Sequence, residues 1–377
     1  MLRCLHLADL HLGWSAAWLG SRAADYARAR DKILERLTTW ILAPQQQLDL
    51  ILIVGDLFDN HRPPAALVES VMAELKAWVD AGITVITVPG NHDEITYHDS
   101  VYQRYGQRWP GILVTNPMPE PPLELTVGGE RLYLYSMAYT GGLTKVEDYL
   151  QPYPRATGQG IHLAAFHGSL DWQTDERGLP LASRLLAEAG YDYVALGHFH
   201  SPRQLQIGST TIAYAGAIAS KGFNDIGCGQ LTLVALQPGA AQVELIPWQD
   251  VDHRVVQLDI SGFADEEELA AHIHSLADPA LLLQVQLEGA ANFFFDTQAL
   301  TSRLARHFYH LELVDTTVHV APGLQDRWAQ ESTIRGLFVQ RLQRLLQEAD
   351  DERAKTVAAL ALRRGMAAFL QGEHRND

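Results

Sequence analysis

The 377 residues suffice for two or three domains, and 47% hydrophobic with 20% charged residues describe an ordinary globular protein, which excludes a disordered or fibrous chain. Strand-sized apolar runs and the first residues predict no membrane segment and no signal peptide, and the two cysteines, Cys4 and Cys228, favour a reducing cytoplasm. The net charge of −16 argues against autonomous tight binding to nucleic acid, unless bound cations face the phosphate.

Polar residues follow the first expected strand, at residues 2–7. Because side chains alternate along a strand, Asp9 and His11 are predicted to point to the same side. A helix is predicted over residues 22–42. Its basic residues indicate a solvated helix face, with contact to DNA as the alternative. These residues are Arg22, Arg28, Arg30, Lys32 and Arg36.

The stretch at residues 54–60 organises the chain, and it directly follows an apolar run at residues 50–53. A buried strand that stops at Gly-Asp places Asp56 in a loop at the carboxyl end of the strand. Open α/β sheets carry their chemistry in such loops. Asp56 is therefore predicted to lie at the centre of a functional site, with Asp59 in the same loop.

The next elements repeat this pattern. A helix is expected near residues 65–79, and a strand at residues 83–88 stops shortly before Asn91, His92 and Asp93. The alternation of strands and helices predicts right-handed parallel connections in an α/β fold.

Two further strands are each followed by histidine. A strand at residues 161–166 stops before His167, and one at residues 193–196 stops before His198 and His200, which alternation again places on one side. Short strands with Pro- and Gly-rich turns predict a sheet that becomes mixed or antiparallel. They are expected within 112–136 and at 204–207, 210–214, 230–235 and 243–246, with a helix near 181–189.

The domain boundaries are predicted at residues 1–250, 251–322 and 323–377. The middle segment has the pattern of a compact β-α-β-α-β unit with no second ligand cluster. The last segment carries two amphipathic helices with many arginines. Such helices most often pack on their own domain, and docking to a partner is the alternative.

Five separated strand ends thus carry oxygen or imidazole groups and no cysteine. One such group is often a satisfied polar residue in a turn, but five together indicate a metal site. These ligand types suit Mn²⁺, Fe or Zn²⁺ better than Ca²⁺. Two ions that share an aspartate are a known arrangement for phosphate-ester hydrolysis. The candidates are Asp9, His11, Asp56, Asp59, Asn91, His92, His167, His198 and His200.

In order along the chain, the motifs D-x-H, G-D-x-x-D, G-N-H-D, H and G-H-x-H resemble those of the calcineurin-like metallophosphoesterases over roughly residues 1–225. Within that superfamily the chain is most similar to the DNA-repair exonuclease group of SbcD and YhaO-like proteins, at residues 5–13, 55–59 and 214–217. The resemblance implies an α/β fold, an α+β sandwich of two packed mixed sheets flanked by helices. A small α/β cap domain and C-terminal helices would follow.

The resemblance also implies two divalent metal ions, usually Mn²⁺, with Fe, Mg²⁺ or Zn²⁺ as alternatives. His92 would meet the scissile phosphate and protonate or stabilise the leaving oxygen. Asp93 would orient His92, and Asp59 would have a supporting role. The implied ligands are Asp9, His11, Asp56 and His200 for one ion, and Asp56, Asn91, His167 and His198 for the other.

The implied activity is exonucleolytic hydrolysis at DNA ends in double-strand-break repair. The cap domain would orient the DNA, and the terminal helices would dock on an SMC-like ATPase of the SbcC or YhaN type. A homodimer is implied too, with Trp14, Trp18 and Leu19 as interface or core residues. One loop departs from the pattern, since residues 224–225 are Asn-Asp where many relatives have Gly-Glu or Asp-Glu.

Two alternatives stay open. The first is another enzyme of the superfamily: a protein phosphatase, a nucleotide pyrophosphohydrolase or a cyclic-nucleotide phosphodiesterase. Asn60 and Asp93 replace the Arg and Glu of protein phosphatases, which disfavours phosphoproteins and leaves small phosphodiesters. The second is a catalytically silent scaffold for an ATPase, which the full set of ligand residues and His92 disfavours.

Overall fold

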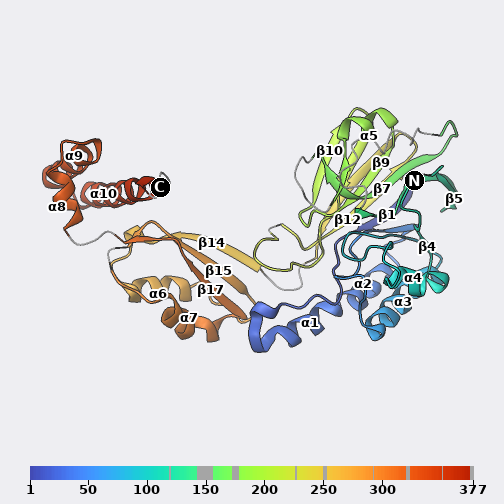
Figure 1. The fold of residues 1–377 in the computed structure, drawn as a ribbon, viewed down its shortest axis with the longest axis horizontal. Helices are drawn as coiled ribbons and strands as arrows, with labels where there is room; N and C mark the ends of the chain where they lie inside the picture. The colour runs from blue at the N-terminus through green and yellow to red at the C-terminus, as the bar shows by residue number, and fades with distance from the viewer. Residues whose placement is uncertain are drawn as a thin grey trace. The chain divides into compact units, whose positions relative to one another are not determined.

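The computed structural model describes residues 1–118, 120–141, 156–171, 178–225, 227–248, 253–291, 293–319, 323–349 and 351–373 (Figure 1). The chain divides into two compact units, Met1–Asp250 and Val251–Asp377. Across these described ranges, every helix is too short or too polar to cross a bilayer.

Two β-sheets form the first unit, and the bounds of their strands follow in the order in which neighbours are hydrogen-bonded. The first sheet contains β13 (Ala240–Pro247), β12 (Gln230–Gln237), β1 (Leu2–Leu7), β2 (Leu50–Val54), β3 (Thr84–Val88) and β4 (Ile112–Leu113). The second contains β10 (Arg203–Ile207), β11 (Thr210–Tyr214), β9 (Tyr193–Gly197), β7 (Ile161–Leu170), β6 (Glu130–Ser136) and β5 (Leu123–Val127), with β8 (Leu179–Leu181) paired to β7.

Both sheets are mixed. In the first, β1, β2 and β3 are parallel while β12 runs antiparallel to β1. In the second, β7 is parallel to β6 and to β9, while β10 and β5 are antiparallel to their neighbours. The predicted fold class, two mixed sheets flanked by helices, is therefore confirmed.

Apolar side chains of the two sheets meet in one buried layer. Leu52 and Val54 of β2 belong to the same cluster as Leu163 of β7 and Ala195 of β9. The strand β2 is an unbroken apolar run because both of its faces are covered. Each buried Leu or Val side chain contributes about 1.5–3 kcal/mol to stability. This layer fixes the strand ends that carry the polar residues.

The helices of the first unit are α1 (Ala23–Asp31), α2 (Ile33–Ile41), α3 (Ala65–Asp80), α4 (Val101–Tyr105) and α5 (Ser183–Ala189), with 3₁₀ turns η1 (Ala17–Arg22) and η2 (Gly106–Arg108). Helices α2, α3 and α4 pack on the first sheet and α5 on the second, whereas α1 packs on η1 and α2. Against the first sheet, α2 and α3 pack through an apolar cluster that includes Leu37 and Trp78. The single helix predicted over residues 22–42 is instead two helices, separated at Lys32.

The second unit has the predicted β-α-β-α-β order. A parallel sheet of β14 (His253–Asp259), β15 (Leu282–Glu288) and β17 (His310–Asp315) packs against α6 (Glu266–His274) and α7 (Thr297–Leu304). Small additions are η4 (Ile260–Gly262), η5 (Ala305–His307) and the pair β16 (Ala290–Ala291) and β18 (Val318–His319).

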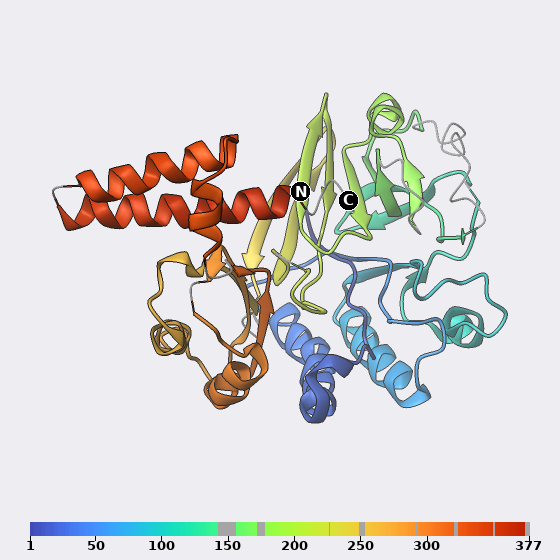
Figure 2. The ribbon, with the colours of Figure 1, turned by 60° about the vertical axis from the view of Figure 1, so that its left-hand side comes forward.

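Three helices end this unit, one more than the apolar pattern predicted. They are α8 (Leu324–Ala329), α9 (Ile334–Glu348) and α10 (Glu352–Glu373). The long helices α9 and α10 lie side by side (Figure 2), and the rings of Phe338 and Phe369 meet between them at 5.6 Å. Residues 323–377 fall in the same compact unit as residues 251–322.

Candidate metal centre

Parallel strands bring the first polar residues together. Asp9 and Asp56 follow the neighbouring strands β1 and β2, and Asn91 follows β3. The loops after β1 and β2 remain paired beyond the strands, since the Asp9 amide donates to the Gly55 carbonyl at 3.1 Å and the His11 amide to the Asp56 carbonyl at 2.9 Å. The carboxyl edge of the sheet therefore presents these side chains at one place.

The backbone at this edge is unusual. Asp9, His11, Asp56 and His198 have positive φ values of 54°, 46°, 50° and 110°. A residue other than glycine in such a conformation costs about 1–3 kcal/mol, and such residues cluster at functional sites. The sequence predicted that strand alternation points Asp9 and His11 to the same side, and this explanation is wrong. The strand β1 ends at Leu7, and a loop with left-handed backbone conformations sets the directions of both side chains.

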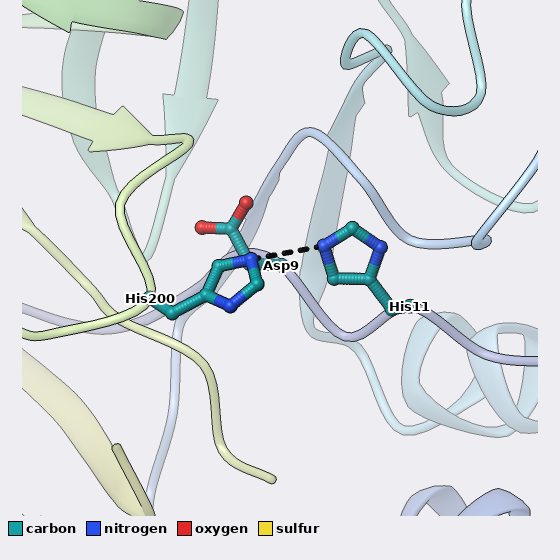
Figure 3. Close-up of side chains that lie close together, drawn as sticks. All are labelled: Asp9, His11 and His200. Carbon is teal, nitrogen blue, oxygen red and sulfur yellow. Dashed lines mark hydrogen bonds between the residues drawn. The ribbon is translucent and has the colours of Figure 1, made fainter. Parts of the chain in front are cut away.

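Asp9, His11 and His200 form a first cluster, in which one ligand atom from each lies within 4.8 Å of the others (Figure 3). The Nε2 atoms of His11 and His200 are 3.1 Å apart. Asp9 also accepts the His198 backbone amide at 3.0 and 3.1 Å through its two oxygens. The loops after β1 and β9 are thereby joined at Asp9.

Asn91, His167 and His198 form a second group. The Asn91 Oδ1 atom lies 2.9 Å from His167 Nε2 and 3.0 Å from His198 Nδ1. His167 is part of β7, so the expectation that this strand stops before it is wrong. The His167 ring fills space that only glycine leaves free, because a Cβ atom at Gly55 would lie 2.0 Å from its Nδ1.

Asp56 stands between the two groups. Its Oδ2 atom lies 3.6 Å from His11 Nε2 and 3.4 Å from His167 Nε2. Its Oδ1 atom accepts the backbone amide of His92 at 2.9 Å. This central place is the one expected of a shared ligand.

Burial and charge set the pKa values here. Burial raises the pKa of Asp9 to about 6, although the positive charge of His167 acts to lower it. Burial would also raise the pKa of Asp56, but the charge and hydrogen bond of His167 hold it far below its usual range. Burial would lower the pKa of His167, yet Asp56 raises it to about 9. A proton on His167 therefore balances the carboxylates, and a cation can take its place.

His92 lies at the rim, with 38% of its side chain exposed. Its Nδ1 is 2.8 Å from the Asp59 carbonyl oxygen, which can only accept, so Nδ1 carries the proton and donates it there. The Nε2 atom then remains available to exchange a proton with a ligand. His92 also has an atom within 4.8 Å of ligand atoms of His11 and Asp56.

Among the described residues, Asp93 makes no hydrogen bond to the His92 ring, so the prediction that it orients His92 stays a prediction of an indirect effect. Its buried carboxylate accepts from the Gly90 amide at 2.7 Å, the Phe58 amide at 3.1 Å and the Tyr102 hydroxyl at 2.8 Å. Among the described contacts the direct partner of the His92 ring is the Asp59 carbonyl rather than Asp93. Asp93 thus fixes the loop that carries His92, and burial raises its pKa to about 6.

Three residues at the centre were missed or misread from sequence. Arg30 is 3% exposed, and its guanidinium donates to the His11 carbonyl at 2.6 Å, so it belongs to the core and not to a solvated face. Lys221 donates to Asp59 Oδ1 at 2.8 Å. Asp225 Oδ1 lies 3.0 Å from His200 Nδ1. Only the departure noted at residues 224–225 pointed to this loop.

The residues present suit divalent cations. Carboxylates, an amide oxygen and imidazoles converge without cysteine, a set that fits Mn²⁺, Fe or Zn²⁺. The facing Nε2 atoms of His11 and His200 support this, because two imidazole lone pairs 3.1 Å apart need a proton or a cation between them.

A family model for calcineurin-like phosphoesterases matches residues 2–202. The chain belongs to this family. The prediction of a metal-dependent phosphoesterase is thereby confirmed at the level of the family. Membership does not test the role of each residue, so the ligand assignment stays a prediction.

Relatives with more specific names match a larger part of the chain. It is 27% identical to the SbcD component of the nuclease SbcCD of Bacillus subtilis, over 66% of this chain and 69% of the relative. It is 23% identical to "Uncharacterized metallophosphoesterase YhaO" of the same organism, over 69% and 64%. It is 29% identical to "DNA double-strand break repair protein Mre11" of Aeropyrum pernix, over 58% and 54%. The predicted resemblance to the DNA-repair nuclease group is confirmed.

Proposed function

We propose that this phosphoesterase is a two-metal DNA exonuclease that hydrolyses phosphodiester bonds at DNA ends during double-strand-break repair in the cytoplasm. The observation that carries the proposal is the convergence of the candidate ligands around Asp56, with His92 at the rim. The similarity to the SbcD component of the nuclease SbcCD and to Mre11 supports DNA as the substrate.

In this proposal the chain holds two divalent cations, preferably Mn²⁺. The cations would supply an activated water and neutralise charge on the phosphate. The left-handed loops and the glycines that pack against His167 order the ligand side chains before a cation binds. This lowers the entropy cost of cation binding. One cation would contact Asp9, His11, Asp56 and His200, and the other Asp56, Asn91, His167 and His198.

His92 is the proposed catalytic residue. Its Nδ1–H bond to the Asp59 carbonyl fixes the ring and leaves Nε2 for the substrate. A protonated Nε2 can donate to the oxygen that leaves the phosphorus, or stabilise its charge. Asp93 and Tyr102 would keep the His92 loop in place, and Asp59 would hold His11 through its carboxylate, 3.2 Å from Nδ1.

The acidic surface shapes the proposal for partners. Several arginines are paired with carboxylates, such as Arg62 with Asp99 at 3.1 Å and Arg184 with Glu188 at 2.7 Å. With a net charge of −16, this chain has a weak electrostatic hold on DNA. An SMC-like ATPase of the SbcC or YhaN type would supply the missing affinity.

The C-terminal helices are the proposed docking site for that ATPase. Ile334, Leu337 and Val357 are 80%, 63% and 61% exposed, which is unusual for large apolar side chains on one helical pair. Residues 251–322 would orient the DNA. A homodimer is part of the proposal as well, and Trp18, 40% exposed, is a better interface candidate than the buried Leu19.

Turnover of three substrates tests the reaction: end-labelled linear DNA, a cyclic nucleotide and bis-p-nitrophenyl phosphate, each with Mn²⁺ and with a chelator. The proposal expects Mn²⁺-dependent release of nucleotides from DNA ends. The acidic surface favours one alternative, an enzyme for small phosphodiesters, and activity on these but not on DNA would replace the proposal with it. A chain that binds Mn²⁺ and is inactive on all three, alone and with the ATPase, would point to the scaffold.

A further inference from the structure

The rings of His11 and His200 each contact a carboxylate through the Nδ1 atom. Their Nε2 atoms face each other at 3.1 Å, so their Nδ1 atoms point away from the shared space. There, His200 Nδ1 lies 3.0 Å from Asp225 and His11 Nδ1 lies 3.2 Å from Asp59. A carboxylate can only accept, so each Nδ1 donates its hydrogen to the carboxylate beside it. The Lys221 ammonium also lies 3.4 Å from His11 Nδ1, and it donates at the shorter distance of 2.8 Å to the same Asp59 oxygen. Each neutral ring is then left with an Nε2 lone pair for a cation.

One short loop connects these two carboxylates. The Lys221 backbone amide donates to Asp225 Oδ2 at 2.7 Å, and the Lys221 ammonium donates to Asp59 Oδ1 at 2.8 Å. The three side chains are only 16% to 23% exposed, so these charge-assisted bonds are partly shielded from water. The Ser220 hydroxyl further stiffens the turn, because it donates to the Gly222 carbonyl at 2.6 Å.

The other group of candidate ligands is held by different means. His167 donates from Nδ1 to the Val54 carbonyl at 3.0 Å, so the end of β2 orients this ring. His198 is tied through its backbone amide to Asp9. The two rings of the first cluster are thus supported by Asp59 and the loop at residues 220–225, and the ring of His167 by the end of β2. The His198 backbone, in contrast, is tied to Asp9 of the first cluster.

We infer that Lys221 and Asp225 are positioning residues for the cation held by Asp9, His11 and His200. The loop at residues 220–225 sets the affinity of this cation independently of the cation held by Asn91, His167 and His198. The inference rests on the proposed function only in requiring that the chain binds two divalent cations. Partners of this kind typically change metal affinity by about 10- to 100-fold.

Calorimetric titration of the full chain with Mn²⁺ tests the inference. The wild type should bind two ions, and Asp225→Ala should weaken one of them by about 10- to 100-fold and leave the other within about twofold. Asp225→Asn should cost less, because the amide oxygen still accepts from His200 Nδ1. Lys221→Met should weaken the same ion by a smaller factor, because it frees Asp59 but also removes a positive charge that lies 3.4 Å from His11 Nδ1.

Two variants control for general damage. Asp192 is a buried carboxylate that accepts the backbone amides of His162 and Gly239 at 2.8 and 3.0 Å, so Asp192→Asn should lower the melting temperature without changing either Mn²⁺ affinity. Lys76→Met removes an exposed lysine that pairs with Asp80 and should change neither property.

Two results would overturn the inference. If Asp225→Ala weakens both ions equally, or neither, while circular dichroism shows a folded chain, the loop does not act on one cation. If the wild type binds no Mn²⁺ at all, the proposed function fails first and this inference fails with it. The wild-type titration therefore separates the two failures.

Discussion

The two compact units differ in what they bury and what they expose. In Met1–Asp250 the charged Asp9, Asp56 and His167 are at most 2% exposed, whereas in Val251–Asp377 the apolar Ile334 and Leu337 are 80% and 63% exposed. A buried charge is stable only when it is paired or binds a metal, and large apolar side chains that are exposed together can mark a contact surface. We therefore propose that the first unit carries the chemistry and that the second provides a surface for a partner, and that mutations can separate the two.

Replacement of Asp56 should have the largest effect on metal binding and hydrolysis in the first unit. Asp56→Ala removes the carboxylate between His11 and His167. We expect Mn²⁺ binding to be lost and phosphodiester hydrolysis to fall by about 10³-fold or more, because a two-metal site supplies several kcal/mol of stabilisation. Titration with Mn²⁺ and turnover of bis-p-nitrophenyl phosphate measure this. Retained two-site binding would show that Asp56 is not a shared ligand.

His92→Ala should separate catalysis from metal binding in the same unit. The ring lies at the rim and is tied to the Asp59 carbonyl, so we expect turnover to fall by about 10²- to 10⁴-fold while two Mn²⁺ ions still bind. Equal loss of turnover and of Mn²⁺ affinity would instead make His92 a ligand, a role that its closeness to His11 and Asp56 keeps open.

The pH dependence should change sign when metal is added. The pKa of His167 is raised to about 9 by Asp56, so its ion pair stabilises the chain fully below the ordinary value of about 6.5, and this stability is lost as pH rises through 9. In the presence of a chelator, this group makes thermal stability fall from pH 7 to 9.

Mn²⁺ must displace the same proton, so its apparent affinity should rise by about tenfold per pH unit in this range. Melting curves at pH 7, 8 and 9, with Mn²⁺ and with chelator, measure both slopes. A stabilisation by Mn²⁺ that does not depend on pH would contradict the pairing of His167 with Asp56.

Tyr102→Phe should have a moderate effect. The lost hydroxyl donates to the buried Asp93 at 2.8 Å, and its removal should cost about 1–3 kcal/mol in the free energy of unfolding. Chemical denaturation measures this cost. The matched control is Tyr97→Phe, because Tyr97 is 49% exposed. Equal stabilities of the two variants would show that the hydrogen bond from Tyr102 to Asp93 does not contribute to the free energy of unfolding.

Leu337→Glu and Val357→Glu should have the smallest effect on the isolated chain. Both residues are exposed, so stability should change by at most about 0.5 kcal/mol and turnover should not change. Co-purification with the co-expressed SMC-like ATPase should be lost. Leu362→Glu, at a position 4% exposed, is the control and should destabilise the helices. If the first two variants still co-purify with the ATPase, the docking surface does not include Leu337 and Val357.

Much of the fold could be predicted because its signals are local. The apolar run before Asp56 and the alternation of strands and helices defined β2 and its neighbours. The local backbone of the site could not be predicted, since the left-handed conformations of Asp9 and His11 break the strand pattern from which their direction was inferred. Their convergence was nevertheless expected, because the motif residues were placed at strand ends.

Contacts between distant residues could not be predicted at all. Lys221 and Asp59 are 162 positions apart, and the residues next to each of them give no indication of the bond. The burial of Arg30 likewise follows from the tertiary path of the His11 loop, while its position in an arginine-rich helix indicated a solvated face. Tertiary packing overrides such local patterns.

The most direct test of the central claim is degradation of end-labelled linear double-stranded DNA by the purified chain with Mn²⁺, beside His92→Ala loaded with the same two ions. The account predicts that the wild type releases labelled nucleotides and that the variant is slower by about 10²- to 10⁴-fold. Equal degradation by both proteins would contradict the assignment of the chemistry to this centre.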